Sequence, residues 1–234
     1  MGRVLRRFVA ARIFNAVLAG RRVRRRFSEI TNYILGGNVN ISMRIKQLLV
    51  VAGLMAGFCQ GAAAVEVAGV KFDDTAKVGG KELKLNGAGV RAFVGLIKVY
   101  AIGMYLTEKK NTTVDALALT GPRRMKLVLM RKVDSDELGQ KFMEGLNKNS
   151  DKAEKAKFVD QTIKMGEIFA SITELDKGSV ITTDYVPDVG LQVYVNDKKM
   201  GEPIPGLAFA NAYFRIWLGD HPADSSLKEK LLGN

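Results

Sequence analysis

Two side chains with complementary hydrogen-bonding chemistry, Arg91 and Tyr100, are predicted to lie opposite one another in a hairpin. Two largely apolar stretches meet at Gly95-Leu96, and glycine at the first position permits the positive φ that a two-residue hairpin turn needs. Directly opposed residues point to the same face, with Cβ atoms roughly 5 Å apart. The turn therefore predicts four pairs: Val94 with Ile97, Phe93 with Lys98, Ala92 with Val99, and Arg91 with Tyr100.

The Arg91–Tyr100 pair suggests a site for an anion. Removing a guanidinium from water is costly unless it is paired. An arginine can donate two parallel hydrogen bonds to a carboxylate, and a tyrosine hydroxyl can add a third. One interpretation is an anion-head site at the end of an apolar pocket. The other is that Arg91 pairs with an internal Asp or Glu while Tyr100 packs in the core, and the spacing leaves both open.

The strand that carries Tyr100 is predicted to be central in its sheet. Residues 96–106 alternate between two faces, and both faces are mainly apolar. Such a strand is covered on both sides. One face holds Leu96, Lys98, Tyr100, Ile102, Met104 and Leu106, and the other holds Ile97, Val99, Ala101, Gly103 and Tyr105.

The remaining elements alternate between strand and helix periodicity. Strands are expected at 65–72, 81–86, 124–133, 179–185 and 191–195, and helices at 115–119, from the Asp134–Glu137 cap onward, and at 150–173 and 206–218, with a last helix capped by Asp224 or Ser225. This order predicts an α+β fold, with a large antiparallel sheet and helices packed on one face.

The charge of the chain is concentrated at its N-terminus. The 234 residues carry a formal charge of +12, but residues 1–42 alone hold nine Arg and one Glu. From Val65 onward, 25 Lys and Arg oppose 23 Asp and Glu. The folded body therefore shows no nucleic-acid footprint, and its 47% hydrophobic content is sufficient for one domain.

Residues 43–64 have the pattern of a signal peptide. Arg44 and Lys46 precede an apolar stretch at 48–58, and small residues follow up to Ala64. We expect cleavage after Ala64, export to the bacterial periplasm, and a mature domain at 65–234. A retained membrane anchor is the main alternative, while Phe58 argues against lipid attachment at Cys59. The basic segment 1–42 is interpreted as an extension upstream of a start at Met43; an amphipathic helix on an anionic surface and an organelle-targeting segment are the alternatives. We expect contact with the membrane only through the targeting segment.

The motifs of the common enzyme classes are absent from the sequence. There is no G-x-S-x-G, H-E-x-x-H, P-loop or G-x-G-x-x-G pattern. The single histidine, His221, is expected to be structural or exposed, and the single cysteine, Cys59, would leave with the signal peptide. We therefore expect no metal and no cofactor.

Several motifs in a consistent order resemble the chalcone isomerase superfamily over residues 68–233. The most specific is G-A-G-V-R at 87–91, followed by K-x-x-A-I-G-x-Y-L at 98–106. Weaker matches are Gly121-Pro122, the K-x-M-E pattern of Lys141 to Glu144, and L-G-D-H at 218–221. The resemblance implies an open-faced β-sandwich.

The resemblance also implies which parts of a ring-closing site are present. The plant enzymes add a phenolate to an enone within one substrate molecule. Arg91 and Lys141 match the family's Arg and Lys, but Tyr100 stands where the enzymes carry a Thr, Leu138 where they carry a Tyr, and Gly145 where they carry an Asn. Ile216-Trp217 replaces a Thr-Met pair. Leu138 and Gly145 offer no hydrogen-bonding side chain, and loss of such polarising groups is expected to weaken catalysis.

The Arg-plus-Tyr combination resembles the branch of the superfamily that binds fatty acids without turnover. We expect a small lipophilic carboxylate as ligand, with Arg91 and Tyr100 at its head and Lys141 at the rim. The pocket is predicted to be lined by Met104, Leu129, Leu138, Phe142, Gly145, Ile216 and Trp217. An intramolecular lyase acting on an enone and a structural protein of the envelope remain as alternatives, and the sequence does not give the oligomeric state.

Overall fold

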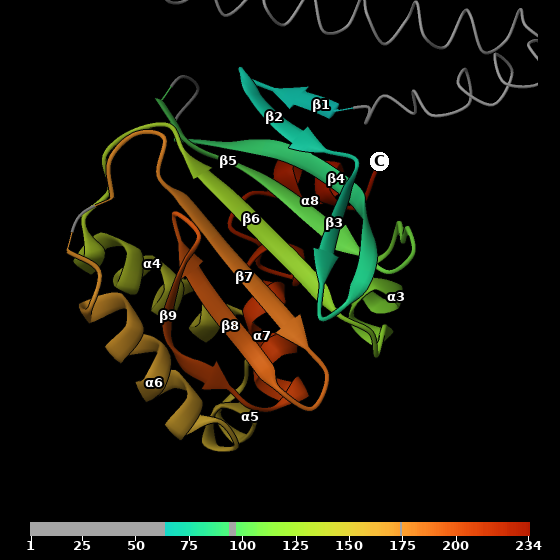
Figure 1. Cartoon of the computed structure of the whole chain (residues 1–234). Helices are drawn as coiled ribbons and strands as arrows, with labels where there is room; N and C mark the ends of the chain where they lie inside the picture. The colour runs from blue at the N-terminus through green and yellow to red at the C-terminus, as the bar shows by residue number, and fades with distance from the viewer. Residues whose placement is uncertain (1–63, 94–96, 174) are drawn as a thin grey trace, which may run out of the picture. The chain divides into compact units, whose positions relative to one another are not determined.

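Seven antiparallel strands form one curled sheet in which neighbours in space are neighbours in sequence (Figure 1). The computed structural model describes residues 64–93, 97–173 and 175–234. A separate two-stranded hairpin precedes the sheet. The hairpin strands are β1 (Ala64–Val67) and β2 (Val70–Asp73), and the sheet strands are β3 (Thr75–Val78), β4 (Lys81–Phe93), β5 (Ile97–Leu106), β6 (Arg123–Leu129), β7 (Val180–Val186), β8 (Gly190–Val195) and β9 (Lys198–Ile204).

Helices pack against one face of this sheet, which confirms the predicted α+β architecture. Buried side chains from five of the helices join those of the sheet in a single large core, while the short α5 buries none. Figure 1 shows α7 behind the central strands, with α4 and α6 beside it. The helices are α3 (Thr113–Ala118), α4 (Ser135–Lys148), α5 (Lys152–Ala156), α6 (Val159–Ala170), α7 (Leu207–Leu218) and α8 (Ser225–Leu231).

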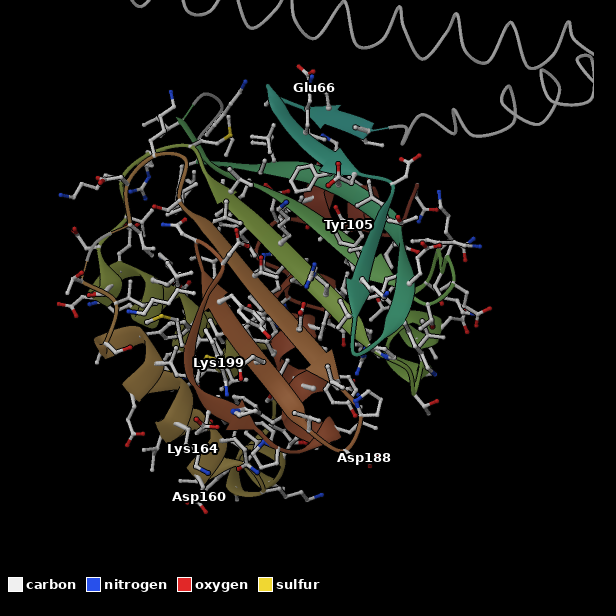
Figure 2. The ribbon with its side chains drawn as sticks, in the orientation of Figure 1. Glu66, Tyr105, Asp160, Lys164, Asp188 and Lys199 are labelled. Carbon is white, nitrogen blue, oxygen red and sulfur yellow. The ribbon has the colours of Figure 1, made fainter. Side chains whose placement is uncertain are left out.

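The opposite face of the sheet changes from apolar to polar across its width. Beneath the β1–β2 hairpin, Phe72 packs with Leu85 and Tyr105 in a second, smaller core. Farther along, strand pairing places Arg124 beside Asp184, and Lys126 in the row that ends at Lys199 on β9. Figure 2 labels Tyr105 and Lys199 on this face, and Asp160 and Lys164 on the outer side of α6.

Several predicted elements differ from the structure. The first strand, expected at 65–72, is a hairpin because Ala68 and Gly69 adopt positive φ values of 52° and 86° and reverse the chain. The long helix expected at 150–173 is broken into α5 and α6, and Ile163 of α6 is 56% exposed. Strands β3 and β9 were not predicted.

The last helix, α8, is fixed on β4 by the residues of the G-A-G motif. The side-chain amide of Asn86 donates hydrogen bonds to the carbonyl oxygens of Leu231 (2.7 Å) and Lys110 (2.8 Å). A Cβ atom at Gly87 would lie 2.0 Å from the carbonyl oxygen of Lys230, and one at Gly89 would lie 2.6 Å from Leu227. The glycines are therefore needed for close packing of the helix on the strand that carries Arg91.

Some predictions fall outside the described residues. These are the basic extension at 1–42, the proposed signal peptide apart from Ala64, and the turn at Gly95-Leu96. Among the helices that the structure describes, none has both the length and the apolar character needed to span a bilayer.

Candidate ligand-binding site

The predicted pairing of Arg91 with Tyr100 is confirmed by the register of β4 and β5. Beyond this pair the register shifts, so that Ala92 faces Lys98 and Phe93 faces Ile97. The predicted pairs of Ala92 with Val99 and of Phe93 with Lys98 are wrong because Val99 is an extra residue on β5, a β-bulge. The predicted pair of Val94 with Ile97 lies outside the described residues.

The bulge changes which side chains reach the helix side of the sheet. In a regular strand Val99 and Tyr100 would point to opposite faces. Here Val99 is buried in the large core and lines the same cavity as Tyr100. A bulge re-aims side chains in this way, and this one adds an apolar wall next to the phenol.

An apolar cavity lies between the sheet and helices α4, α6 and α7. About 80 Å³ of it admits the centre of a water molecule, which is room for several waters or for a slim aliphatic chain. Its charged groups are Arg91, Glu137 and Lys141. The other lining residues are Phe93, Val99, Tyr100, Leu127, Leu129, Val133, Leu138, Phe142, Met165, Phe169, Ile181, Thr183, Val193, Tyr213, Ile216 and Trp217.

Tyr100 is held in place by Trp217 of α7. The indole Nε1 donates a hydrogen bond of 2.8 Å to the tyrosine oxygen. Burial raises the pKa of Tyr100, while the positive charge of Arg91 and the hydrogen bond from Trp217 act in the opposite direction. The hydroxyl is therefore protonated at neutral pH, and its hydrogen has no acceptor among the described residues, so it is available to a ligand.

Arg91 has no carboxylate within ion-pair distance among the described residues. Its guanidinium carbon lies 5.3 Å from the centre of the Phe93 ring, and the ammonium of Lys141 lies 5.8 Å from the same ring. The interpretation in which Arg91 is neutralised by an internal Asp or Glu is therefore wrong for the part of the chain that the structure covers. The side chain is half-buried, so its charge is available to a ligand.

The carboxylates near the cavity mouth are engaged by other cations. Glu137 forms an ion pair with Arg131, and the hydrogen bond from Arg131, then the charges of Arg131, Lys141 and Arg91, lower the pKa of Glu137. Glu144 accepts from Lys141 at 2.8 Å and from Lys148 at 2.7 Å, which lowers its pKa to about 2. Lys141 is thus tied to Glu144 at the exposed rim, which leaves Arg91 as the better placed cation.

Most of the predicted lining residues lie around this cavity. Leu129, Leu138, Phe142, Ile216 and Trp217 line it together with the predicted head-group residues. Met104 and Gly145, the other two predicted lining residues, do not line it.

Met104 is fully buried in the core but does not line the cavity, because it lies one side-chain row beyond Ile102 on β5. Gly145 lines a smaller hollow that adjoins the mouth and shares Arg91 and Lys141 with the cavity. A Cβ at Gly145 would lie 2.7 Å from Ile216, so this glycine is needed where α4 crosses α7.

A hydrogen-bonded hydroxyl pair forms the far end of the cavity. The oxygens of Thr183 on β7 and Tyr213 on α7 are 2.9 Å apart, and both side chains are buried. Burial raises the pKa of Tyr213 above the usual range, so its hydroxyl is neutral. Sequence reasoning missed this pair, and the only available signal was the run of three polar residues, Thr182, Thr183 and Asp184, within the strand at 180–186.

No group of three or more metal-ligating side chains occurs within the described ranges. The exposed His221 has a structural setting: its backbone N–H donates to Asn149 Oδ1 at 3.0 Å, and its carbonyl accepts from Asn149 Nδ2 at 2.8 Å. These bonds attach the end of α4 to the loop after α7. The chemistry of the site is therefore that of a cation and a hydroxyl at the mouth of an apolar cavity.

Comparison with known proteins agrees with the fold described above. Residues 64–233 match a family model described as chalcone isomerase-like. A crystal structure of a fatty-acid binding protein from Arabidopsis thaliana is similar, with a TM-score of 0.56 and 15% sequence identity, over 73% of this chain and 96% of that one. At this identity the likeness shows the fold alone. No curated protein gives a significant match.

Proposed function

Since this chain belongs to the chalcone isomerase-like family, we propose that its cavity binds a lipophilic carboxylate such as a fatty acid, without turnover. The observation that carries the proposal is Arg91, a cation with no ion-pair partner in the described chain, beside the Tyr100 hydroxyl at the mouth of an apolar cavity. The fatty-acid binding protein of similar fold is consistent with a ligand of this class.

The two groups at the mouth match the geometry of a carboxylate. Arg91 would donate to both of its oxygens, and the free Tyr100 hydrogen would add a third bond. Hydrogen bonds to charged groups contribute about 1.5–3 kcal/mol each. The aliphatic chain would lie against the side chains of β6 and of α4, and each buried methylene contributes roughly 0.8 kcal/mol.

Binding without chemistry is supported by what lies next to the proposed head group. The family resemblance assigns polarising roles to positions 138 and 145, which are leucine and glycine here. Leu138 lines the cavity with an apolar side chain, and Gly145 has none. A lyase acting on an enone would therefore lack the groups that stabilise its transition state.

The test compares charged and uncharged ligands of one chain length on the delipidated protein. Dodecanoic acid and its methyl ester would be titrated against the wild type, Arg91→Met, and Lys98→Met as a matched control. Lys98 is an exposed cation of the same hairpin that does not line the cavity.

We expect Arg91→Met to weaken binding of the acid by roughly 10- to 100-fold, as for loss of one charge-assisted hydrogen-bonding group. Binding of the ester should change little, and Lys98→Met should affect neither ligand. The proposal is wrong if the wild type binds no acid, or if Arg91→Met binds it as the wild type does.

We propose further that the chain is exported, with cleavage after Ala64. The support is the basic, apolar and small-residue pattern of residues 43–64. Cell fractionation followed by N-terminal sequencing tests this proposal, with Val65 as the expected first residue of the periplasmic form. A cytoplasmic protein that retains residues 43–64 would contradict it.

A further inference from the structure

The hydroxyl pair at the far end of the cavity has a hydrogen-bond donor that no described residue uses. Thr183 and Tyr213 together carry two hydroxyl hydrogens, and the bond between their oxygens uses one. Neither hydroxyl makes another hydrogen bond with the described residues, although both side chains are more than nine-tenths buried. One donor is therefore left over inside an apolar cavity.

A buried donor without an acceptor costs free energy, and the side chains around it offer no acceptor. Val193 pairs with Thr183, and the rings of Phe142 and Trp217 lie 6.3 and 5.3 Å from that of Tyr213. None of these side chains accepts a strong hydrogen bond. A purely aliphatic ligand tip would leave the donor unpaired and would also exclude water from it. A ligand with an oxygen at its tip would accept from the free hydrogen, and a ligand hydroxyl would also donate to a remaining lone pair of the two side-chain oxygens.

The register of the sheet gives the offset of the two polar sites along the strands. Tyr100 pairs with Leu129 of β6, and Thr183 pairs with Met125 of the same strand. These partners are four residues apart, which corresponds to about 13 Å along a strand. The Tyr213 ring lies 5.3 Å from that of Trp217, whose Nε1 donates to Tyr100, so the hydroxyls are no farther apart than about this offset. An extended aliphatic chain advances roughly 1.25 Å per carbon, so at most about ten carbons join the two sites.

We propose that the preferred ligand is bifunctional, with a carboxylate at Arg91 and a neutral oxygen, hydroxyl or carbonyl, up to about ten carbons away at the Thr183–Tyr213 pair. This inference rests on the proposed function and specifies the class of carboxylate.

The far group is neutral because the cations that line the cavity, Arg91 and Lys141, are both at its mouth. The buried Arg123 does not line the cavity, since its guanidinium lies between the rings of Tyr185 (4.9 Å) and Phe214 (4.8 Å).

The test is a thermodynamic cycle over ligand and protein. Decanoic acid and 10-hydroxydecanoic acid would be titrated against the wild type, Thr183→Val, Tyr213→Phe and the double variant, with the eight-, twelve- and sixteen-carbon pairs as a length series. The single substitutions each remove one hydroxyl and leave the cavity wall in place. Thermal unfolding of each variant shows whether it is folded.

In the wild type we expect the hydroxy acid to bind at least as tightly as the parent acid. In the double variant the hydroxy acid should bind at least tenfold more weakly than the parent, because its hydroxyl then enters an apolar end. The parent acid should bind to the double variant as tightly as to the wild type, or more tightly. The contrast should be greatest for the eight- and ten-carbon pairs.

The two proposals fail in different ways. If the wild type and the double variant show the same ratio of affinities for the two acids, the inference about the far end is overturned while carboxylate binding stands. If no acid binds to the wild type, the proposed function is wrong, and this inference fails with it.

Discussion

Replacing Gly87 with alanine would place a methyl carbon 2.0 Å from the carbonyl oxygen of Lys230 and 2.8 Å from that of Leu231. Both obstacles are backbone atoms, so no side-chain rotation relieves the clash, and α8 must move away from β4. Overpacking of this kind costs about 1–3 kcal/mol. If α8 detaches, the loss of burial of Leu227, Leu231 and Leu232 adds roughly 1.5–3 kcal/mol for each side chain.

The assay is urea unfolding of Gly87→Ala beside a matched Gly166→Ala control. Gly166 lies within α6, where a new Cβ would meet nothing within 4 Å. Alanine in a helix interior is more favourable than glycine by about 0.5–1 kcal/mol, so Gly166→Ala should raise the free energy of unfolding. Gly87→Ala should lower it by at least about 2 kcal/mol, roughly the middle of the overpacking range. The steric reasoning is refuted if both substitutions change the free energy of unfolding in the same direction. It is also refuted if Gly87→Ala changes that free energy by less than about 0.5 kcal/mol.

Two further predictions concern ionisable groups on the other face of the sheet. Burial, then the charge of Asp73, raises the pKa of Tyr105 to about 12. The protonated phenol therefore contributes fully to stability below the unfolded pKa, and this contribution is lost as pH rises from about 10 to 12. In urea titrations, the difference in unfolding free energy between the wild type and Tyr105→Phe should fall by roughly 2–3 kcal/mol over that range. Arg124 donates to Asp184 at 2.6 and 2.7 Å, and Arg124→Met should cost about 3 kcal/mol because it leaves the buried Asp184 carboxylate unpaired. Adding Asp184→Asn should restore more than half of that loss, and equal Tm values for the single and double variants would contradict it.

The fold was largely predictable because its main strands and helices have clear periodicity. Hydrophobic alternation located β5, β7 and β8, and the acidic cap at 134–137 located α4. Local breaks were not predictable from the same signal. Ala68 adopts a positive φ, a conformation that glycine would normally signal. The break between α5 and α6 falls at Lys157 and Phe158, and neither residue is a proline or a glycine.

The candidate site was predictable where it depends on local pairing, and only there. Counting from a turn brought Arg91 opposite Tyr100, although Phe93 faces Ile97, because the extra residue Val99 compensates for the shifted register next to the turn. The bulge at Val99 follows from how β4 and β5 fit their neighbours, which the hairpin sequence does not reveal. Thr183 and Tyr213 come from a strand and a helix that meet only through tertiary packing, so their pairing has no signature in either segment.

The attachment of α8 to β4 has a consequence for the order in which the molecule is assembled. Asn86 and Leu231 are bonded across 145 positions of the chain, so during synthesis the contacts of the strand that bears Arg91 are incomplete until Leu231 has left the ribosome. Contacts of such long sequence separation form late and slowly. The nascent chain should therefore acquire its ligand-binding competence only after translation of α8, and not while the sheet is being made.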